Sequence, residues 1–171
     1  MAELRADAQR NRAAILAAAA ATFAEYGPKA TTGQVAIRAG VAVGTIFRHF
    51  PTKDALLTAI MKESLERLSA QATDSTLFGF ITAVVTEAAA TRTVVEALSR
   101  VDLADALRGL TEATTGLLGQ AQADGQVRDD VRIDEVMALL TATAQAAQQA
   151  SWTADLQQRT LAIVFAGLAN R

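Results

Sequence analysis

Alanine is the feature that most constrains this chain, because it supplies 39 of the 171 residues. Alanine is the strongest helix former. Ten glycines and two prolines are too few for a β protein, which needs many turns. At this length a chain buries a core without help from disulfides or a metal. We therefore expect an all-α protein with one domain or two small ones.

Few kinds of active site are compatible with this composition. The chain has no cysteine, which excludes disulfides, thiolate metal sites and cysteine nucleophiles. His49 is the single histidine, so a histidine metal cluster and a Ser-His-Asp relay are both disfavoured. We therefore expect no catalytic residue, no metal ligand and no cofactor, and hence a protein that is not an enzyme.

The sequence also predicts no export signal and no membrane partner. Its first residues, MAELRADAQRNR, are charged, unlike the apolar core of a signal peptide. Residues 136–154 are uncharged over about the length of a bilayer span, but glutamines and threonines interrupt them. We therefore interpret that stretch as a buried or partner-facing helix, and we expect a cytoplasmic protein.

The net charge of −2 hides a difference between the two ends of the chain. Residues 1–60 carry seven Lys or Arg and four acidic residues, a net of +3, whereas the remainder carries nine basic and fourteen acidic residues, a net of −5. Such an asymmetry is typical of a chain with one end that faces nucleic acid and a solvated acidic body. The difference is modest and does not identify a partner by itself.

Helix breakers divide the first 70 residues into short helices with short connections. Gly27-Pro28 ends the first, Gly40 ends the second, and Phe50-Pro51 ends the third. The second and third, with a glycine turn between them, have the spacing of a DNA-binding helix-turn-helix. Glycine-containing helical corners also occur in proteins that bind no DNA. The expected ranges are Leu4–Tyr26, a helix after the Thr31-Thr32 cap, Val43–Phe50, and a helix from the Thr52 cap to Leu68.

Beyond Thr73 the chain contains no proline and has a longer helical rhythm. We expect one helix capped by Asp74-Ser75 and a last helix that starts at Thr153 or Asp155. No period of 20–50 residues repeats, which disfavours a solenoid. Between these two helices we expect elements at about Arg92–Arg100, Leu103–Ala123 and Ile133–Ser151.

Residues 31–57, TTGQVAIRAGVAVGTIFRHFPTKDALL, closely resemble the N-terminal DNA-binding domain of TetR-family transcriptional regulators. The resemblance combines a first helix ending in F-x-E-x-G, an AxxAG turn, and a G-T-x-aromatic-x-x-F recognition helix followed by lysine. It covers the first third of the chain, and beyond that it is a resemblance of layout only. It implies an N-terminal three-helix helix-turn-helix domain at residues 1–52 and a C-terminal helical-bundle domain at residues 53–171 for effector binding and dimerisation.

The resemblance also implies which residues meet DNA. Ile46 and Phe50 are the inward anchors of the recognition helix, while its opposite face contacts the duplex. Arg48 either bonds a guanine edge or contacts phosphate alone. His49 is either a phosphate contact or an inert surface residue, and Gly44 either admits the DNA backbone or marks a helix crossing. The implied DNA-binding residues are Thr32, Val43, Gly44, Thr45, Phe47, Arg48, His49 and Lys53.

Three residues depart from the family pattern. Phe47 stands where the family usually has tyrosine, and Ala42 and Val43 replace a serine and a basic residue. These changes remove a hydroxyl, a helix cap and a charge, and phosphate contacts supply much of protein–DNA affinity. Our hypothesis is that the protein makes fewer phosphate contacts than other members and reads thymine methyl groups through Val43.

The C-terminal part offers two further sets of candidates, and ordinary core packing is an alternative for every member. An apolar effector pocket is predicted from Met61, Phe78, Ile81, Val84, Leu103, Leu107, Leu117 and Trp152. A four-helix dimer interface is predicted from Met137, Leu140, Ala144, Leu161, Val164, Phe165 and Leu168. A single helix-turn-helix covers few base pairs, so the mechanism itself calls for a dimer on two half-sites.

The sequence therefore predicts a ligand-responsive transcriptional regulator. We expect a homodimeric repressor that binds a pseudopalindromic double-stranded DNA operator and is released by a small apolar effector. The alternative is a helical small-molecule-binding protein whose DNA-binding head is weakened or lost.

Overall fold

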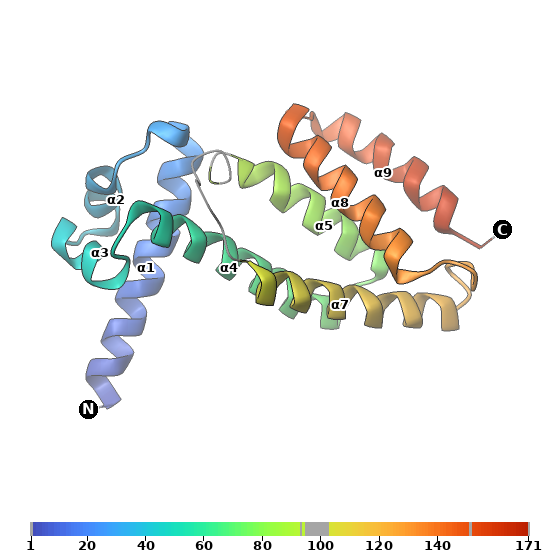
Figure 1. Ribbon diagram of the computed structural model, residues 1–171, viewed down its shortest axis with the longest axis horizontal. Helices are drawn as coiled ribbons and strands as arrows, with labels where there is room; N and C mark the ends of the chain where they lie inside the picture. Colours follow the sequence, from blue (N-terminus) through green and yellow to red (C-terminus); the bar gives the residue numbers. More distant parts are fainter. Residues whose placement is uncertain (1, 93, 95–102, 151, 171) are drawn as a thin grey trace. The chain divides into compact units, whose positions relative to one another are not determined.

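The computed structural model describes residues 2–92, 94, 103–150 and 152–170, and of residues 2–8 the backbone only. Within these ranges the chain forms helices and no strand, apart from an isolated antiparallel bridge between Val127 and Ala169 (Figure 1). The expected all-α fold is confirmed. The α-helices are α1 (Ala2–Tyr26), α2 (Thr32–Ala39), α3 (Val43–His49), α4 (Lys53–Gln71), α5 (Leu77–Ala90), α7 (Ala104–Ala123), α8 (Ile133–Ala150) and α9 (Ala154–Leu168).

The chain divides into two compact units. The first comprises residues 1–63 and 93–103, and the second comprises residues 64–92 and 104–171. The sequence placed the boundary between residues 52 and 53, at the start of α4. The units divide later because Leu56, Leu57 and Ile60, in the first half of α4, are buried in the core of the first unit. The element expected at about Arg92–Arg100 lies largely outside the described residues.

The first unit is built around the helix-turn-helix. Gly40 ends α2 with a φ of 67°, a left-handed conformation that glycine adopts without a Cβ clash. The N–H of Val41 donates to the carbonyl of Ala36 at 3.1 Å, which closes the turn. Ile46 of α3 and its C-cap residue Phe50 are then buried, at 0% and 4% exposed, as the sequence predicted.

The structure narrows the predicted Thr31-Thr32 cap to one residue and moves the cap of α5. Thr31, and not Thr32, is the N-cap of α2, because Thr31 and Gln34 form a reciprocal capping box. The Gln34 N–H donates to Thr31 Oγ1 at 3.3 Å, and the Thr31 N–H donates to Gln34 Oε1 at 2.9 Å. Thr76, and not Asp74-Ser75, caps α5, because a 3-10 turn at Ala72–Asp74 delays the start of that helix. The predicted cap Thr52 is confirmed, and of the two starts predicted for the last helix, Thr153 and Asp155, Thr153 is the cap.

The second unit contains the end of α4 with α5, α7, α8 and α9. α5 packs along α8, and the two helices lie side by side in Figure 1. The end of α9 is tied to the segment after α7, since the N–H of Arg128 donates to the carbonyl of Leu168 at 3.1 Å. The core consists of Leu68, Ala72, Leu77, Phe80, Ile81, Val84, Val85, Leu110, Leu117, Leu118, Ala121, Val127, Val131, Val136, Leu140, Ala147, Leu161 and Leu168.

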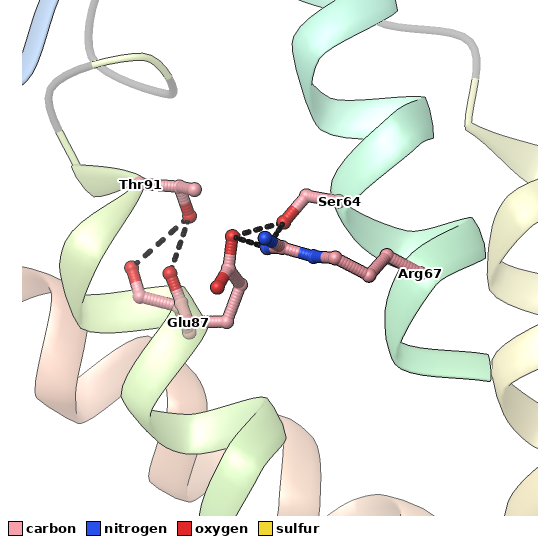
Figure 2. A network of polar contacts seen from close by, with 5 residues as sticks. Ser64, Arg67, Glu87 and Thr91 are labelled. Atoms are coloured by element: carbon pink, nitrogen blue, oxygen red, sulfur yellow. Dashed lines mark hydrogen bonds and ion pairs between the residues drawn. The ribbon is translucent and has the colours of Figure 1, made fainter. Parts of the chain in front are cut away.

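A small polar network joins α4 to α5 inside this unit. Ser64 is 5% exposed, and its hydroxyl donates to Glu87 Oε1. Arg67 Nη2 lies 2.8 Å from the same carboxylate oxygen and 3.3 Å from the Ser64 hydroxyl. Thr91 donates to the backbone carbonyl of Glu87 at 2.8 Å (Figure 2). The carboxylate therefore collects donors from two positions of α4, which fixes the register between the two helices.

Candidate nucleic-acid interface

The recognition helix α3 separates buried from exposed side chains. Ile46 and Phe50 face the core, whereas Val43 and Phe47 are 40% and 45% exposed. Arg48 is exposed as well. The exposed side of this helix therefore carries two apolar side chains next to a cation. In the major groove, apolar side chains contact thymine methyl groups and arginine bonds the edge of guanine.

The environment of Gly44 bears on its two interpretations. A Cβ built on this residue meets no atom of the described chain within 4 Å. Gly44 is exposed, and it is not among the glycines with positive φ. Neither a crossing helix of the same chain nor the backbone conformation therefore requires glycine here. The approach of the DNA backbone to Gly44 stays a prediction.

Thr45 and His49 are half-buried on α3, and the His49 ring centroid lies 6.2 Å from that of Phe50. Thr32, the first residue of α2, is also half-buried. The expected DNA-binding residues of α3 thus lie on one short helix, but only Val43, Gly44, Phe47 and Arg48 are exposed. Their contacts with DNA stay a prediction.

Lys53, the first residue of α4, is bonded within the chain. Its Nζ donates to the carbonyls of Pro28 and Ala30, both at 3.0 Å, and lies 5.1 Å from the ring centroid of Phe23. These contacts use most of the donor capacity of one ammonium group.

Arg38 illustrates how the positive charge of the first unit is partly neutralised. Its guanidinium forms an ion pair with Glu25 and lies 3.5 Å from the Thr22 hydroxyl. The hydrogen bond from Arg38 lowers the pKa of the Glu25 carboxyl, and the hydrogen bond with Glu25 raises the pKa of the Tyr26 hydroxyl. Arg12 is exposed and stacks over the Phe50 ring, 5.5 Å from its centroid. Of the seven cations counted in residues 1–60, Arg38 is therefore paired within the chain, whereas Arg12 keeps its charge at the surface.

The residues expected to line an effector pocket fall into different cores. Met61 and Leu103 belong to the first unit. In the second unit Ile81, Val84 and Leu117 are buried in the core, Phe78 and Trp152 pack against it, and Leu107 is 48% exposed. A pocket formed by the six residues of the second unit stays a prediction.

A groove of about 560 Å³ lies in the second unit between α5 and α9. The Gln157 amide donates to the Thr86 hydroxyl at 2.7 Å, so polar groups of the two helices meet there. Phe165 lines the groove, and its ring lies 4.6 Å from that of Phe78. Sequence reasoning missed Thr86 and Gln157, because isolated polar residues in alanine-rich helices carry no pattern.

The residues predicted for the dimer interface include both core and surface positions. Leu140, Leu161 and Leu168 are at most 5% exposed in the single chain, and Met137, Val164 and Phe165 pack against the same core. Ala144 is half-buried. The large apolar residues exposed on α8 and α9 are Leu139, Leu156 and Ile163, which are 40%, 47% and 75% exposed. Sequence reasoning missed these three, although each lies on a predicted helix.

Within the described part of the chain no group of three or more metal-ligating side chains comes together. No helix among the described residues has the length and apolarity needed to cross a membrane.

Comparisons with known proteins agree with the sequence and the fold. Residues 15–60 match the model of the tetR family of bacterial regulatory proteins, and residues 71–170 match the C-terminal domain of SbtR-like transcriptional regulators. The HTH-type transcriptional repressor Rv1474c of Mycobacterium tuberculosis is 36% identical over 136 residues, 72% of each chain. Another repressor of that organism, Rv3405c, is 52% identical over 50 residues, 29% of this chain and 27% of its own. The TetR regulatory protein of Mycobacterium vanbaalenii has a similar structure, with a TM-score of 0.78 and 34% identity over 97% of this chain and 99% of its own.

Proposed function

Because the chain belongs to the TetR family of transcriptional regulators, we propose that it is a ligand-responsive repressor that binds a pseudopalindromic operator as a homodimer. The family consists of DNA-binding regulators and not of enzymes. A small, apolar effector would release the repressor from DNA. Such a repressor works in the cytoplasm of a bacterium, the compartment that holds the chromosome.

The observation that carries this proposal is the exposed face of α3. Val43, Gly44, Phe47 and Arg48 are exposed around a helix whose opposite side is anchored by Ile46. In this proposal Arg48 bonds a guanine edge, and Gly44 allows the helix to lie close to the DNA backbone. We expect a smaller contribution to DNA affinity from Thr32, Thr45 and His49, because their side chains are half-buried.

The same surface supports an interface with few phosphate contacts. Phe47 has no hydroxyl, Ala42 has no side-chain cap, and Arg38 is paired with Glu25. Affinity would then rest on apolar contact between Val43 and thymine methyl groups to a greater extent than on charge. Because phosphate contacts set the salt dependence, this proposal predicts a slope of log affinity against log salt much shallower than about −10.

Binding of the purified chain to duplex fragments from beside its own gene tests the function. Fluorescence anisotropy at several salt concentrations gives both the affinity and the salt slope. Arg48→Ala should weaken binding by about 1–3 kcal/mol and relax the preference for one base in the operator. Arg108→Ala should leave binding unchanged, since Arg108 is an exposed arginine on α7 in the second unit. A uniform loss over all sequences would make Arg48 a backbone contact. A salt slope as steep as about −10 would contradict the small number of phosphate contacts.

Uracil in place of thymine isolates the methyl readout. One lost methyl contact is worth about 0.8 kcal/mol, or roughly fourfold in affinity. We expect that loss for the natural chain and a smaller one for Val43→Ala, which already lacks the contact. Equal losses for both proteins would show that Val43 does not read the methyl group.

We propose that dimerisation uses α8 and α9. Leu156 and Ile163 lie seven residues apart on α9, so both face the same side, and that side is exposed in the single chain. Met137, Ala144, Val164 and Phe165 would border the interface, while Leu140, Leu161 and Leu168 support it from the core. Sedimentation equilibrium tests this proposal. Ile163→Glu should give a monomer, whereas Leu107→Glu, which places the same charge at an exposed apolar residue of α7, should not. A dimeric Ile163→Glu variant would contradict the proposal.

The effector would bind in the second unit, near Phe78, Ile81 and Trp152. A ligand lowers DNA affinity only if it binds better to a state in which the two recognition helices of the dimer are misspaced. Coupling of this kind amounts to about 1–3 kcal/mol. An apolar compound that raises the melting temperature and also releases DNA would identify the effector. Compounds that stabilise the chain without releasing DNA would be ligands but not effectors.

The second candidate is a helical ligand-binding protein with a weakened or lost DNA-binding head. The observation that favours it is the loss of polar groups at Ala42, Val43 and Phe47. The same anisotropy experiment separates the two: sequence-selective, salt-sensitive binding supports the repressor, and no binding at any salt concentration supports the second candidate.

A further inference from the structure

Lys53 resembles a lysine that holds phosphate in TetR regulators, yet in this chain its ammonium group is engaged internally. An ammonium group has three N–H donors and no acceptor. Two of the donors reach the carbonyl oxygens of Pro28 and Ala30, each at 3.0 Å. The face of the Phe23 ring, 5.1 Å away, attracts the same charge.

The two carbonyls belong to the connection between α1 and α2. That connection begins at Gly27, with a φ of 64°, and continues as a 3-10 turn to Lys29. Ala30 is 1% exposed, so water has little access to its peptide group, and a buried carbonyl needs a donor from the protein. The next residue, Thr31, caps α2. The position of α2 therefore depends on how this connection is held.

We propose that Lys53 is a positioning residue that fastens the α1–α2 connection to the start of α4, and that it does not hold phosphate. The Lys53 side chain joins three parts of the first unit, namely α1 through Phe23, the connection through its carbonyls, and α4 itself. Because α2 packs against both α1 and α3, this fastening sets the placement of the recognition helix. Two of the three N–H donors of Lys53 are therefore engaged within the chain before any DNA arrives.

Two substitutions of Lys53 and one control test the proposal in the full chain. Lys53→Met keeps the length of the stem beside Phe23 but removes the charge and all three donors. Lys53→Arg keeps the charge but replaces the compact ammonium by a planar fork. Lys29→Met removes the same charge from an exposed residue of the same connection. For each protein we would measure the melting temperature without DNA and the salt dependence of duplex binding.

We expect Lys53→Met to lower the melting temperature by about 4–6 °C and Lys29→Met to leave it unchanged. Lys53→Met should weaken DNA binding by the same factor at every salt concentration, with the slope of the parent. Lys53→Arg should also lower the melting temperature, since its charge survives but its geometry does not. Should Lys53→Met be unfolded at the assay temperature, the Arg variant supplies both measurements.

A phosphate contact gives the opposite pattern. The slope would then become shallower by about 0.9 in Lys53→Met, the melting temperature would match that of Lys29→Met, and Lys53→Arg would bind DNA as the parent does. Any one of these results overturns the proposal. The DNA measurement rests on the proposed function, whereas the thermal measurement does not. A parent chain that binds no DNA would refute the function and leave the melting temperatures to decide the role of Lys53.

Discussion

Removal of the Ser64 hydroxyl should destabilise the second unit through the polar network between α4 and α5. Ser64 is 5% exposed, and its hydroxyl donates to the Glu87 carboxylate. The Glu87 side chain is 27% exposed and also forms an ion pair with Arg67. A hydrogen bond to a charged group contributes about 1.5–3 kcal/mol. Water and Arg67 still reach the carboxylate, and alanine is the better helix former by about 0.5 kcal/mol. We therefore expect Ser64→Ala to lower the free energy of unfolding by about 1 kcal/mol, or the melting temperature by about 2–4 °C.

Ser69→Ala is the matched control on the same helix. The Ser69 hydroxyl donates to the carbonyl of Leu65 at 2.9 Å, within its own helix. Such back-bonding slightly destabilises a helix, so this change should be neutral or slightly stabilising. Urea unfolding followed by circular dichroism measures both variants, and equal slopes of free energy against urea would show that the unfolded states are comparable.

A double-mutant cycle makes the test specific to the network. Ser64→Ala and Glu87→Ala should show a coupling energy of about 1 kcal/mol, since each removes the partner of the other. The pair Ser69→Ala and Glu87→Ala should be additive within about 0.3–0.5 kcal/mol. Equal stabilities of Ser64→Ala and Ser69→Ala, or additive behaviour of Ser64 and Glu87, would refute the reasoning.

Four further predictions concern the first unit. Thr31→Ala should cost about 1 kcal/mol of stability in urea unfolding and Thr32→Ala clearly less, because only Thr31 caps α2. Gly40→Ala should lower the free energy of unfolding by about 1 kcal/mol, since φ is 67° there. Gly44→Ala, in open space on α3, should raise the free energy of unfolding by up to about 1 kcal/mol and yet weaken DNA binding. An unchanged DNA affinity would show that DNA does not approach Gly44. The ion pair of Glu25 with Arg38 holds the pKa of the Glu25 carboxyl below the ordinary value. The stabilisation from this pair is therefore present above the unfolded-state pKa and is lost as the pH falls through the folded-state pKa. The difference in melting temperature between the natural chain and Glu25→Gln should shrink over that acidic range, and a difference independent of pH would show that the pair contributes nothing.

Local signals account for the part of the fold that the sequence predicted. Glycine, proline and hydroxyl residues act through their own backbone or within four residues of it, so Gly40 and Thr52 were placed correctly. The start of the last helix was narrowed to Thr153 or Asp155, and Thr153 is the cap. The choice of Thr31 over Thr32 was also readable, because Thr31-x-x-Gln34 is a capping-box pattern. The cap at Thr76 was not readable, since the preceding 3-10 turn leaves no pattern of its own in the sequence.

Long-range partners explain what the sequence could not supply. The acceptors of Lys53 are main-chain carbonyls, which have the same chemistry in every residue, so no pattern indicates which of them the folded chain brings near. Apolar spacing marks a residue for burial but does not name the core that receives it. Met61 and Leu68 follow one periodic stripe of α4, yet they enter the cores of different units.

The helices α8 and α9 show the limit of periodicity in its simplest form. Both are apolar on more than one side, so the sequence cannot distinguish the residues that face the core from those that face outward. Leu161 and Ile163, two residues apart, are 2% and 75% exposed. Contiguous apolar patches on a single chain mark candidate partner surfaces, and Leu156 and Ile163 are exposed on the same side of α9. Ile163 is therefore a better probe of the proposed dimer interface than its neighbour Leu161, although both looked alike in the sequence.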